Sequence, residues 1–525
     1  MPSLITRRFR IHNAKQFQEA VDEAAPSNLY FFISRITPWG TETSPPTPTD
    51  TIQANDFDIW RNMIAMKKVG TADTTFAIPR YNWNTGNVYH QYDSANTSMF
   101  AQAELYSTPA HANTFYVVNQ NFNVYKCLSN NKGVASTVEP TGTSQNILNT
   151  ADGYRWKFMY TIESGARLKF LNENWMPVKT IASDDGSSQW DVQNTAANGA
   201  IDVIQVTSGG NSYVYNTGTL SAVTSSTEVK LPASANAFNG VYTGSSMYLT
   251  SGTGAGQVRT ITSYAGATKT VKLDTAFVPT PANTTTYQIA PTITITGDGT
   301  LATAQANVTN GVINTITVVS PGSNYSNATI AITANSSHGT GGAARAMIPP
   351  PGGHGSDPVS ELGGHNVILN TLLSGTESDT FMSVNNFRTV GILKDPRLRS
   401  TGAIANSSTF DLTTKLTLST VSGSGNFKQD EVVTGGTSGA TAKLAQFSNT
   451  NSANTAGSVR LVDVNGNFAV NETITAANTG ITSTVTLVTK PLIRSFAGDV
   501  IYIENRSPVT RSSDQIEDIK LVVKF

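Results

Sequence analysis

Cysteine and charged residues are scarce in this chain, and each shortage excludes a class of protein. Cys127 is the single cysteine among 525 residues, so no intrachain disulfide can form. Charged residues make up 14% of the sequence, against about 25% in typical globular proteins. With a formal net charge of −1, nothing in the charge balance favours binding to nucleic acid or to an anionic membrane.

Long apolar runs are absent as well. No run approaches the roughly 18 residues that a membrane-spanning helix needs, and the basic start of the chain lacks the apolar stretch of a signal peptide. We therefore expect no membrane insertion. Glycine, serine, threonine and asparagine are abundant instead, with 42 glycines, which predicts many short strands and turns. The length of 525 residues predicts roughly three or four domains.

The first part of the sequence has the pattern of an α+β unit. Asn13, with Gln16 three residues later, has the form of a capping box at the start of a helix. Residues 29–36 form an apolar run that predicts a buried strand, and a second helix is expected over residues 57–67. Cys127 lies in a strand-like run without a partner base, so we expect it to be buried and structural.

Beyond residue 195 the sequence is dominated by strand patterns, and it contains an internal repeat. Residues 201–206 align with 313–318, and Tyr213 aligns with Tyr325. Two copies are too few for a solenoid, so we interpret residues 196–347 as one or two inserted β domains built from related motifs.

A second β-rich stretch occupies residues 401–490 and has a repeat of its own. Residues 426–444 align with 467–485, including a phenylalanine and a glutamate at matching places. The remaining pieces, 1–195, 348–400 and 491–525, then form one discontinuous scaffold. The fold class expected is mainly β with some α, with antiparallel sandwich-like or barrel-like modules carried on that scaffold.

The final residues, 501–525, contain two strand-like runs around a polar turn marked by Pro508. In the first run, Ile501 and Ile503 are expected to share the buried face. The second run is expected to dock in a sheet, because free chain ends usually fray. Its apolar positions are Ile519, Leu521, Val523 and Phe525.

The strongest candidate for a chemical site is the glycine-rich segment 352–365. It holds four potential metal ligands, namely His354, Asp357, Glu361 and His365. Their spacing matches no HExxH-type motif, and a simpler interpretation makes Asp357 a helix N-cap followed by Pro358 at the first helical position.

A second glycine-rich stretch, 252–256, lacks the register of a nucleotide-binding loop and favours a hairpin. We expect no catalytic residue, no cofactor and no metal, and therefore no enzyme.

A series of short motifs follows a fixed order along the chain, although none of them encodes chemistry. They are Ser34-Arg35, Pro38-Trp39, Pro48-Thr49-Asp50, Asp58-Ile-Trp60, Ile78-Pro-Arg80, Val124–Leu128, Glu139-Pro140, Asp152–Phe158, Trp175-x-Pro177, Asn386-Phe387-Arg388 and Tyr502-x-Glu504-Asn505-Arg506-x-Pro508. In this order they resemble the baseplate wedge subunits of T-even-like contractile-tailed bacteriophages, the gene-product-eight type. The resemblance covers roughly 1–195, 349–400 and 491–525.

That resemblance implies a non-enzymatic virion protein of the phage tail. Family members are mixed-β proteins that dimerise within each wedge, contact other baseplate wedge proteins and take part in the shape change when the tail contracts. We therefore expect a location in the tail baseplate, with assembly in the cytoplasm of the host bacterium.

The residues expected at or near an interface are Trp39, Trp60, Glu504, Asn505, Arg506 and Pro508. Aromatic residues and arginine are enriched at contacts between proteins, but an internal ion pair of Arg506 with Glu504 or Asp514 is an equal alternative. The competing function is a receptor- or polysaccharide-binding tail protein whose polar β insertions bind glycan.

Overall fold

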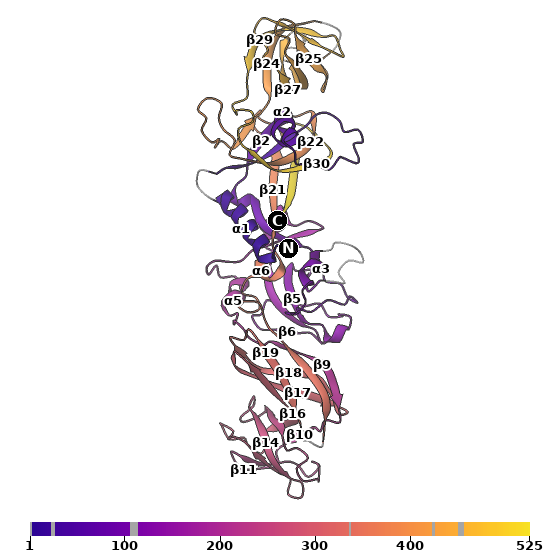
Figure 1. Cartoon of the computed structure of the whole chain (residues 1–525), viewed down its shortest axis with the longest axis vertical. Coiled ribbons are helices and arrows are strands. Elements are labelled where there is room, and N and C mark those ends of the chain that lie inside the picture. The colour runs from indigo at the N-terminus through magenta and orange to yellow at the C-terminus, as the bar shows by residue number, and fades with distance from the viewer. Residues whose placement is uncertain (1–2, 23–26, 105–113, 335–337, 423–425, 450–455) are drawn as a thin grey trace.

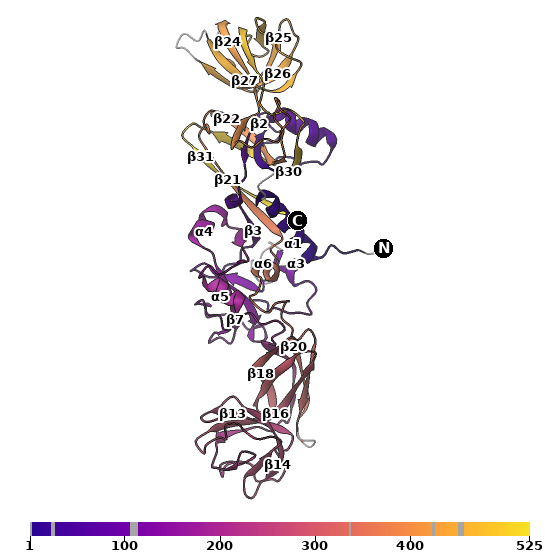
Figure 2. The same ribbon diagram turned by 90° about the vertical axis from the view of Figure 1, so that its left-hand side faces the viewer.

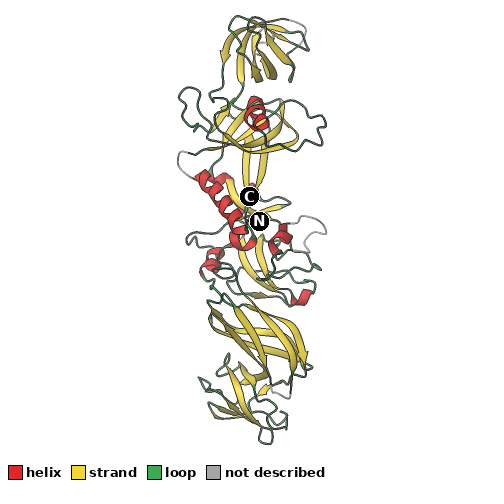
Figure 3. Cartoon of the chain, in the orientation of Figure 1, coloured by secondary structure: helices red, strands yellow, loops and turns green. Residues whose placement is uncertain are grey.

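The chain folds into several β modules that follow one another along a long axis (Figure 1). The computed structural model describes residues 3–22, 27–104, 114–334, 338–422, 426–449 and 456–525. Strands dominate, and the helices gather in the middle of the molecule (Figure 3). The predicted fold class, mainly β with some α, is confirmed.

The first sheet has five antiparallel strands drawn from three distant parts of the sequence. Its order is β23 (Thr409–Asp411), β2 (Met63–Lys68), β1 (Leu29–Ser34), β22 (Asn385–Lys394) and β30 (Asp499–Arg511). Every residue of β1 is buried, as expected for a central strand covered on both faces. β23 lies inside the stretch that the sequence assigned to the second insertion, yet it pairs with β2.

A second sheet holds the C-terminal strand. Its order is β31 (Ile516–Lys524), β21 (Asn366–Ser374), β3 (Thr74–Pro79) and β8 (Trp175–Val178). The expected docking of the last strand is confirmed, because β31 pairs with β21 along its whole length and Leu521 is fully buried.

The turn before β31 does not lie at Pro508. The turn occupies residues 512–515, and Pro508 lies within β30. Proline is tolerated there because β30 is an edge strand with an irregular register opposite β22. The side chains of β30 also point the other way from expectation. Ile501, expected on the buried face, is 44% exposed, whereas Tyr502 packs against the core.

Helix α1 (Arg7–Asp22) begins earlier than the sequence pattern predicted. Thr6, rather than Asn13, occupies the capping position, and its Oγ1 accepts a hydrogen bond from Phe9 N at 3.2 Å. The helix contacts β21 and β3, and the ring centroids of Phe17 and Phe525 lie 5.5 Å apart.

The second predicted helix is half wrong. A π-helical segment η1 (Gln53–Ile59) continues into α2 (Trp60–Asn62), but strand β2 starts at Met63. Met63 to Met66 are all buried between β1 and β23. Burial on both faces erases the apolar–polar alternation that marks a strand, so the sequence cannot distinguish it from a helix.

A third sheet lies in the middle of the molecule beside the shorter helices. Its order is β4 (Tyr116–Val118), β5 (Asn123–Ser129), β7 (Arg155–Thr161) and β6 (Leu148–Asn149). The helices are η2 (Thr71–Asp73), α3 (Met99–Glu104), η3 (Asn131–Gly133), α4 (Ser164–Phe170), α5 (Ser188–Asn194) and α6 (Pro358–Leu362). Cys127 on β5 is fully buried and burial raises the pKa of its thiol well above the usual value, so its expected structural role fits.

One end of the molecule is a twelve-stranded antiparallel sheet (Figure 2). Its strands are β9 (Val203–Asn211), β10 (Asn216–Thr219), β11 (Ala222–Ser225), β12 (Glu228–Lys230), β13 (Ser245–Ser251), β14 (Val258–Ala265), β15 (Thr270–Leu273), β16 (Thr286–Gly297), β17 (Thr300–Thr309), β18 (Val312–Ser323), β19 (Ala328–Thr333) and β20 (Thr340–Met347). The glycine-rich stretch 252–256 joins β13 to β14 as the predicted hairpin. The long β16 runs between two hydrophobic cores.

The two copies of the first repeat lie side by side and run in opposite directions. Ile204 on β9 and Ile316 on β18 occupy equivalent places in the two copies, and they are direct cross-strand partners. Tyr213 and Tyr325, the other aligned pair, are both buried in the same core. Equivalent residues therefore meet each other across an antiparallel pair.

The opposite end is a closed six-stranded barrel, in which the second repeat forms two equivalent halves. The barrel order is β24 (Thr414–Ser422), β27 (Ala456–Asn465), β26 (Thr441–Asn449), β25 (Val432–Gly435), β28 (Thr473–Ala476) and β29 (Thr482–Thr489). The equivalent residues Thr434 and Thr475 pair directly. The buried carboxylate of Glu431 accepts hydrogen bonds from Thr479, and the equivalent Glu472 accepts them from Thr437 and Ser438.

Candidate protein interface

A groove of about 300 Å³ opens where β1 leaves the five-stranded sheet. The pairing of β1 with β2 shifts register between Ile33 and Ser34, and Arg35 follows with φ of 59°. This bulge and the left-handed residue turn the chain away from the sheet. The groove is lined by Ser34, Arg35, Trp39, Pro46, Thr47, Pro48, Thr49, Ala54, Asp58, Ile59, Asn62, Thr389, Ile503 and Asn505.

The predicted interface residue Trp39 lies against Arg35 and strand β30. The guanidinium carbon of Arg35 lies 4.0 Å from the centroid of the Trp39 ring, a cation–π arrangement. Trp39 Nε1 donates a hydrogen bond to Arg506 O at 3.0 Å. Trp39 therefore ties the loop that follows β1 to the edge strand of the same sheet.

The segment 504–508 forms the opposite side of this region. Phe387 pairs with Val509 and Thr389 with Asn505, so Arg388 alone lies opposite residues 506–508. The resulting bulge contains Pro508, which is half-buried. Asn505 Nδ2 donates to Pro46 O at 2.9 Å, which fixes the proline-rich segment over the groove.

Arg506 forms the internal ion pair with Glu504 that the sequence offered as the alternative to an interface contact, with an N–O distance of 2.6 Å. Their side chains are 28% and 33% exposed, so the pair remains open to a partner. Glu504 Oε2 also accepts a hydrogen bond from the Tyr502 hydroxyl. Burial, together with the nearby Glu504 carboxylate, raises the pKa of Tyr502 and keeps this phenol protonated.

The sixth predicted interface residue, Trp60, lies in the core. It is 8% exposed and packs edge to face against Phe496, with a centroid distance of 6.4 Å. It therefore offers little surface to another chain. The structure brings Trp39 together with the segment that holds Glu504, Asn505, Arg506 and Pro508, and it buries Trp60 in a separate hydrophobic cluster.

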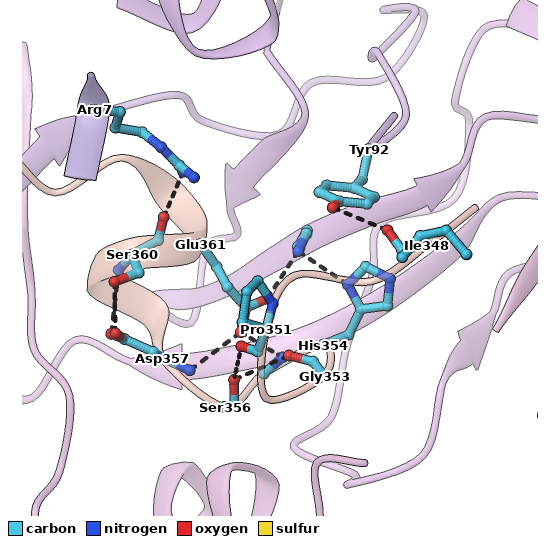
Figure 4. Close-up of polar contacts among 12 residues, drawn as sticks. Arg7, Tyr92, Ile348, Pro351, Gly353, His354, Ser356, Asp357, Ser360 and Glu361 are labelled. Carbon is cyan, nitrogen blue, oxygen red and sulfur yellow. Dashed lines mark hydrogen bonds and ion pairs between the residues drawn. The ribbon is translucent and has the colours of Figure 1, made fainter. Parts of the chain in front are cut away.

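The segment 352–365 forms a buried polar network with strand β5 (Figure 4). Lys126 is fully buried, and its Nζ lies 2.8 Å from Glu361 Oε2 and 3.0 Å from His354 Nδ1. It also lies 4.1 Å from the centroid of the Tyr92 ring. Burial lowers the pKa of Lys126, which the Glu361 carboxylate opposes. Burial and the cations of Lys126 and Lys157 lower the pKa of His354 well below its usual value.

Two other potential metal ligands of this segment, Asp357 and Glu361, also have structural partners, and His365 is buried. Asp357 caps α6, accepting a hydrogen bond from Ser360 N at 3.1 Å, and Pro358 is the first helical residue, as predicted. Glu361 Oε1 accepts from Gly355 N and Asp357 N. Among the residues that the structure describes, no three His, Cys, Asp or Glu side chains are placed to hold a metal ion.

Two central residues were not singled out as site residues from the sequence. Arg35 belongs to one of the ordered sequence motifs, but nothing in a single sequence marks the left-handed backbone that places it against Trp39. Lys126 carried a detectable signal, because a lysine inside a run of six buried strand residues needs a buried partner.

Within the described part of the chain, no helix is both long and apolar enough to cross a membrane.

Comparison with known proteins identifies a family for the N-terminal part of the chain. Residues 3–139 match the family model described as "Bacteriophage T4, Gp8". No curated protein matched the chain. The matched residues include α1, β1, Trp39 and Cys127, and such a match supports a structural role in a phage baseplate. Residues 3–139 are therefore similar to the gene-product-eight type of baseplate protein, as the sequence motifs predicted.

Proposed function

We propose that this protein is a structural subunit of the baseplate wedge in a contractile phage tail. The observation that carries the proposal is the family match over residues 3–139, which includes the Trp39 side of the groove. In this role the protein acts through interfaces with other wedge proteins, in assembly and in the baseplate shape change. We further propose a homodimer within each wedge, assembled in the host cytoplasm.

The domain division that we propose suits such a role. Residues 1–195, 348–400 and 491–525 form the scaffold, which also takes strand β23 from the start of the second insertion. Residues 196–347 and the rest of 401–490 are insertions at its two ends (Figure 1). The scaffold pieces are joined by long-range contacts, such as the bidentate pair of Arg388 with Glu42. We propose that a scaffold held together by such contacts moves as a rigid unit between its neighbours in the wedge.

We propose that the protein has no catalytic activity and needs no metal or cofactor. His354, Asp357 and Glu361 support this, because each has a structural partner. Stoichiometric zinc or iron that is lost in a His354→Ala, His365→Ala double variant would overturn it.

Arg506→Ala tests the interface directly. The Arg506–Glu504 pair is partly exposed, so its loss should cost at most about 1 kcal/mol of folding free energy. We expect the variant to melt like the wild type but to lose dimerisation or binding to a neighbouring wedge protein, measured by analytical ultracentrifugation and wedge reconstitution. If the variant unfolds instead, Arg506 is a scaffold residue and the interface lies elsewhere.

Glycan binding by the insertions is the second candidate. An open groove of about 1080 Å³ lies between the scaffold and the first insertion, and it is lined mainly by polar side chains that include Gln205, Asn314 and Thr317. A glycan array that compares the whole chain with a chain lacking residues 196–347 tests this function. Specific binding by the whole chain alone would support it, and no binding by either would remove it.

A further inference from the structure

Arg35 stands out among the cations around the groove because it has no ion pair within the described residues. The neighbouring cations are matched: Arg388 binds Glu42 at 2.7 Å and Arg506 binds Glu504 at 2.6 Å. Among the described residues, the Arg35 side chain donates one hydrogen bond, to Pro38 O at 3.5 Å. Its Nε is buried without a hydrogen-bond partner, and an unpaired buried donor of a charged group is costly.

A second, independent observation lies beside it. Ser34 is fully buried, lines the same groove, and its Oγ has no hydrogen-bond partner in the described structure. Buried hydroxyl groups are nearly always satisfied. Two adjacent residues therefore present unused donors at one place, a guanidinium and a hydroxyl.

The carboxylates nearest to Arg35 are already engaged. Glu42 binds Arg388, Asp430 accepts a hydrogen bond from Thr37 Oγ1, and Asp58 accepts one from Gln53 Nε2. Their charges favour the cationic form of Arg35, although burial and the nearby Arg388 lower its pKa. None of these carboxylates lies within ion-pair distance of Arg35 in the described structure, so we look for the acceptor that completes the site outside this group.

We propose that the groove receives a single carboxylate side chain from a neighbouring wedge protein, which pairs with Arg35 and accepts a hydrogen bond from Ser34 Oγ. The proposal rests on the proposed function. Arginine suits a carboxylate because its planar donors match two oxygens. Trp39 and the prolines at 46 and 48 supply apolar walls for the stem of that side chain. Asp58 on another wall disfavours a run of acidic residues, so a lone Asp or Glu fits best.

The test measures binding of each purified wedge protein of the same baseplate to the full chain by isothermal titration calorimetry. The variants are Arg35→Gln, Arg35→Lys and Ser34→Ala, and the control is Arg397→Gln. Arg397 is exposed, and its side chain donates to Gly402 O, so this control removes one charge away from the groove.

For one neighbour, we expect Arg35→Gln to weaken binding at least tenfold, Arg35→Lys to retain part of the affinity, and the control to match the wild type. Ser34→Ala should weaken the same interaction about threefold. It should not lower the melting temperature, because the hydroxyl that it removes has no hydrogen-bond partner in the described structure of the free protein. A neighbour variant whose matching carboxylate is neutralised should bind Arg35→Gln no more weakly than the wild-type neighbour does, because the two substitutions remove the same ion pair.

Wild-type affinity of Arg35→Gln for every neighbour overturns the carboxylate site but leaves the wedge role intact. If the wild-type chain binds none of the wedge proteins, the proposed function itself fails, and this inference fails with it.

Discussion

At the scale of single residues, the most consequential contact is the buried pair of Lys126 and Glu361. Both side chains are essentially inaccessible, and their charged atoms are 2.8 Å apart. The pair joins β5 to α6, two elements far apart in the sequence. Burying two charges is expensive, so the pair stabilises the fold only as long as both partners are present.

Lys126→Met should therefore destabilise the protein by about 3–5 kcal/mol, because Glu361 would be left buried without its cation. Denaturant unfolding of the purified chain measures this loss. The double variant Lys126→Met, Glu361→Gln should recover part of the stability. A single variant as stable as the wild type would show that Glu361 is not charged in the fold.

His354 makes the stability of the protein depend on pH. Its pKa is well below 6.5 in the folded chain, chiefly because it is buried, with Lys126 and Lys157 nearby. The unfolded chain takes up a proton on this histidine below pH 6.5 and the folded chain does not. The contribution of His354 is therefore present above pH 6.5 and is lost as the pH falls, by up to about 1.4 kcal/mol per pH unit.

The variant His354→Gln should show a shallower loss of stability between pH 6.5 and pH 5 than the wild type, measured by denaturant unfolding at each pH. His12→Gln, which changes an exposed histidine on α1, serves as the control and should follow the wild-type curve. Parallel curves for wild type and His354→Gln would contradict the assignment.

At the scale of elements, alternation predicts strands with one buried face, whereas strands buried on both faces were predicted unevenly: β1 was expected as a buried strand, but β2 was not. The alternating pattern at 313–318 falls within β18, whereas the apolar spacing over β2 is also that of a helix. The pairing of β22 with β30 and of β21 with β31 had no signal, because register between distant strands depends on tertiary packing. The candidate interface was predicted in part: Trp39 and residues 504–508 meet, but the aim of Arg35 depends on a backbone conformation that sequence does not mark.

The C-terminal strand β31 should be indispensable for folding. Leu521 is fully buried, whereas Ile516 on the same strand is 64% exposed. Leu521→Ala should cost about 2–5 kcal/mol of unfolding free energy, and the matched control Ile516→Ala less than about 0.5 kcal/mol. Equal effects in denaturant titrations would mean that the strand is not docked as described.

The barrel should be separable from the scaffold, and the structure gives better limits for its removal than the sequence. Lys415 pairs with Thr489, so the two ends of the barrel lie side by side. β23 belongs to the five-stranded sheet, so the deletion should start at Thr414 and end at Thr489. Ala445 and Val462 of the barrel reach into the scaffold core, and Arg460 pairs with Asp411 at 2.6 Å.

Replacing residues 414–489 with a short Gly/Ser linker should give a soluble chain that is about 2–3 kcal/mol less stable, since the scaffold loses the apolar cover of Val462. Adding Asp411→Asn to the deletion should restore part of the stability, because burial already raises the pKa of Asp411 and its cation is gone. Thermal unfolding and size-exclusion chromatography measure both effects. Aggregation of the deleted chain would make the barrel an integral part of the scaffold.

At the scale of the whole molecule, the chain is a rod with β modules at its ends and a scaffold between them (Figure 2). The family match lies in that scaffold, as do the groove and the buried Lys126 network. The proposed contacts with neighbours therefore cluster in the middle of the rod. The end modules remain available for other partners.

Electron cryomicroscopy of the tail baseplate of the phage that encodes this chain tests the wedge role most directly. We expect density for the chain in every wedge, with Arg35, Trp39 and residues 504–508 against a neighbouring protein. A tail baseplate that lacks the chain, or one in which the scaffold contacts no other wedge protein, would contradict a structural role in the wedge.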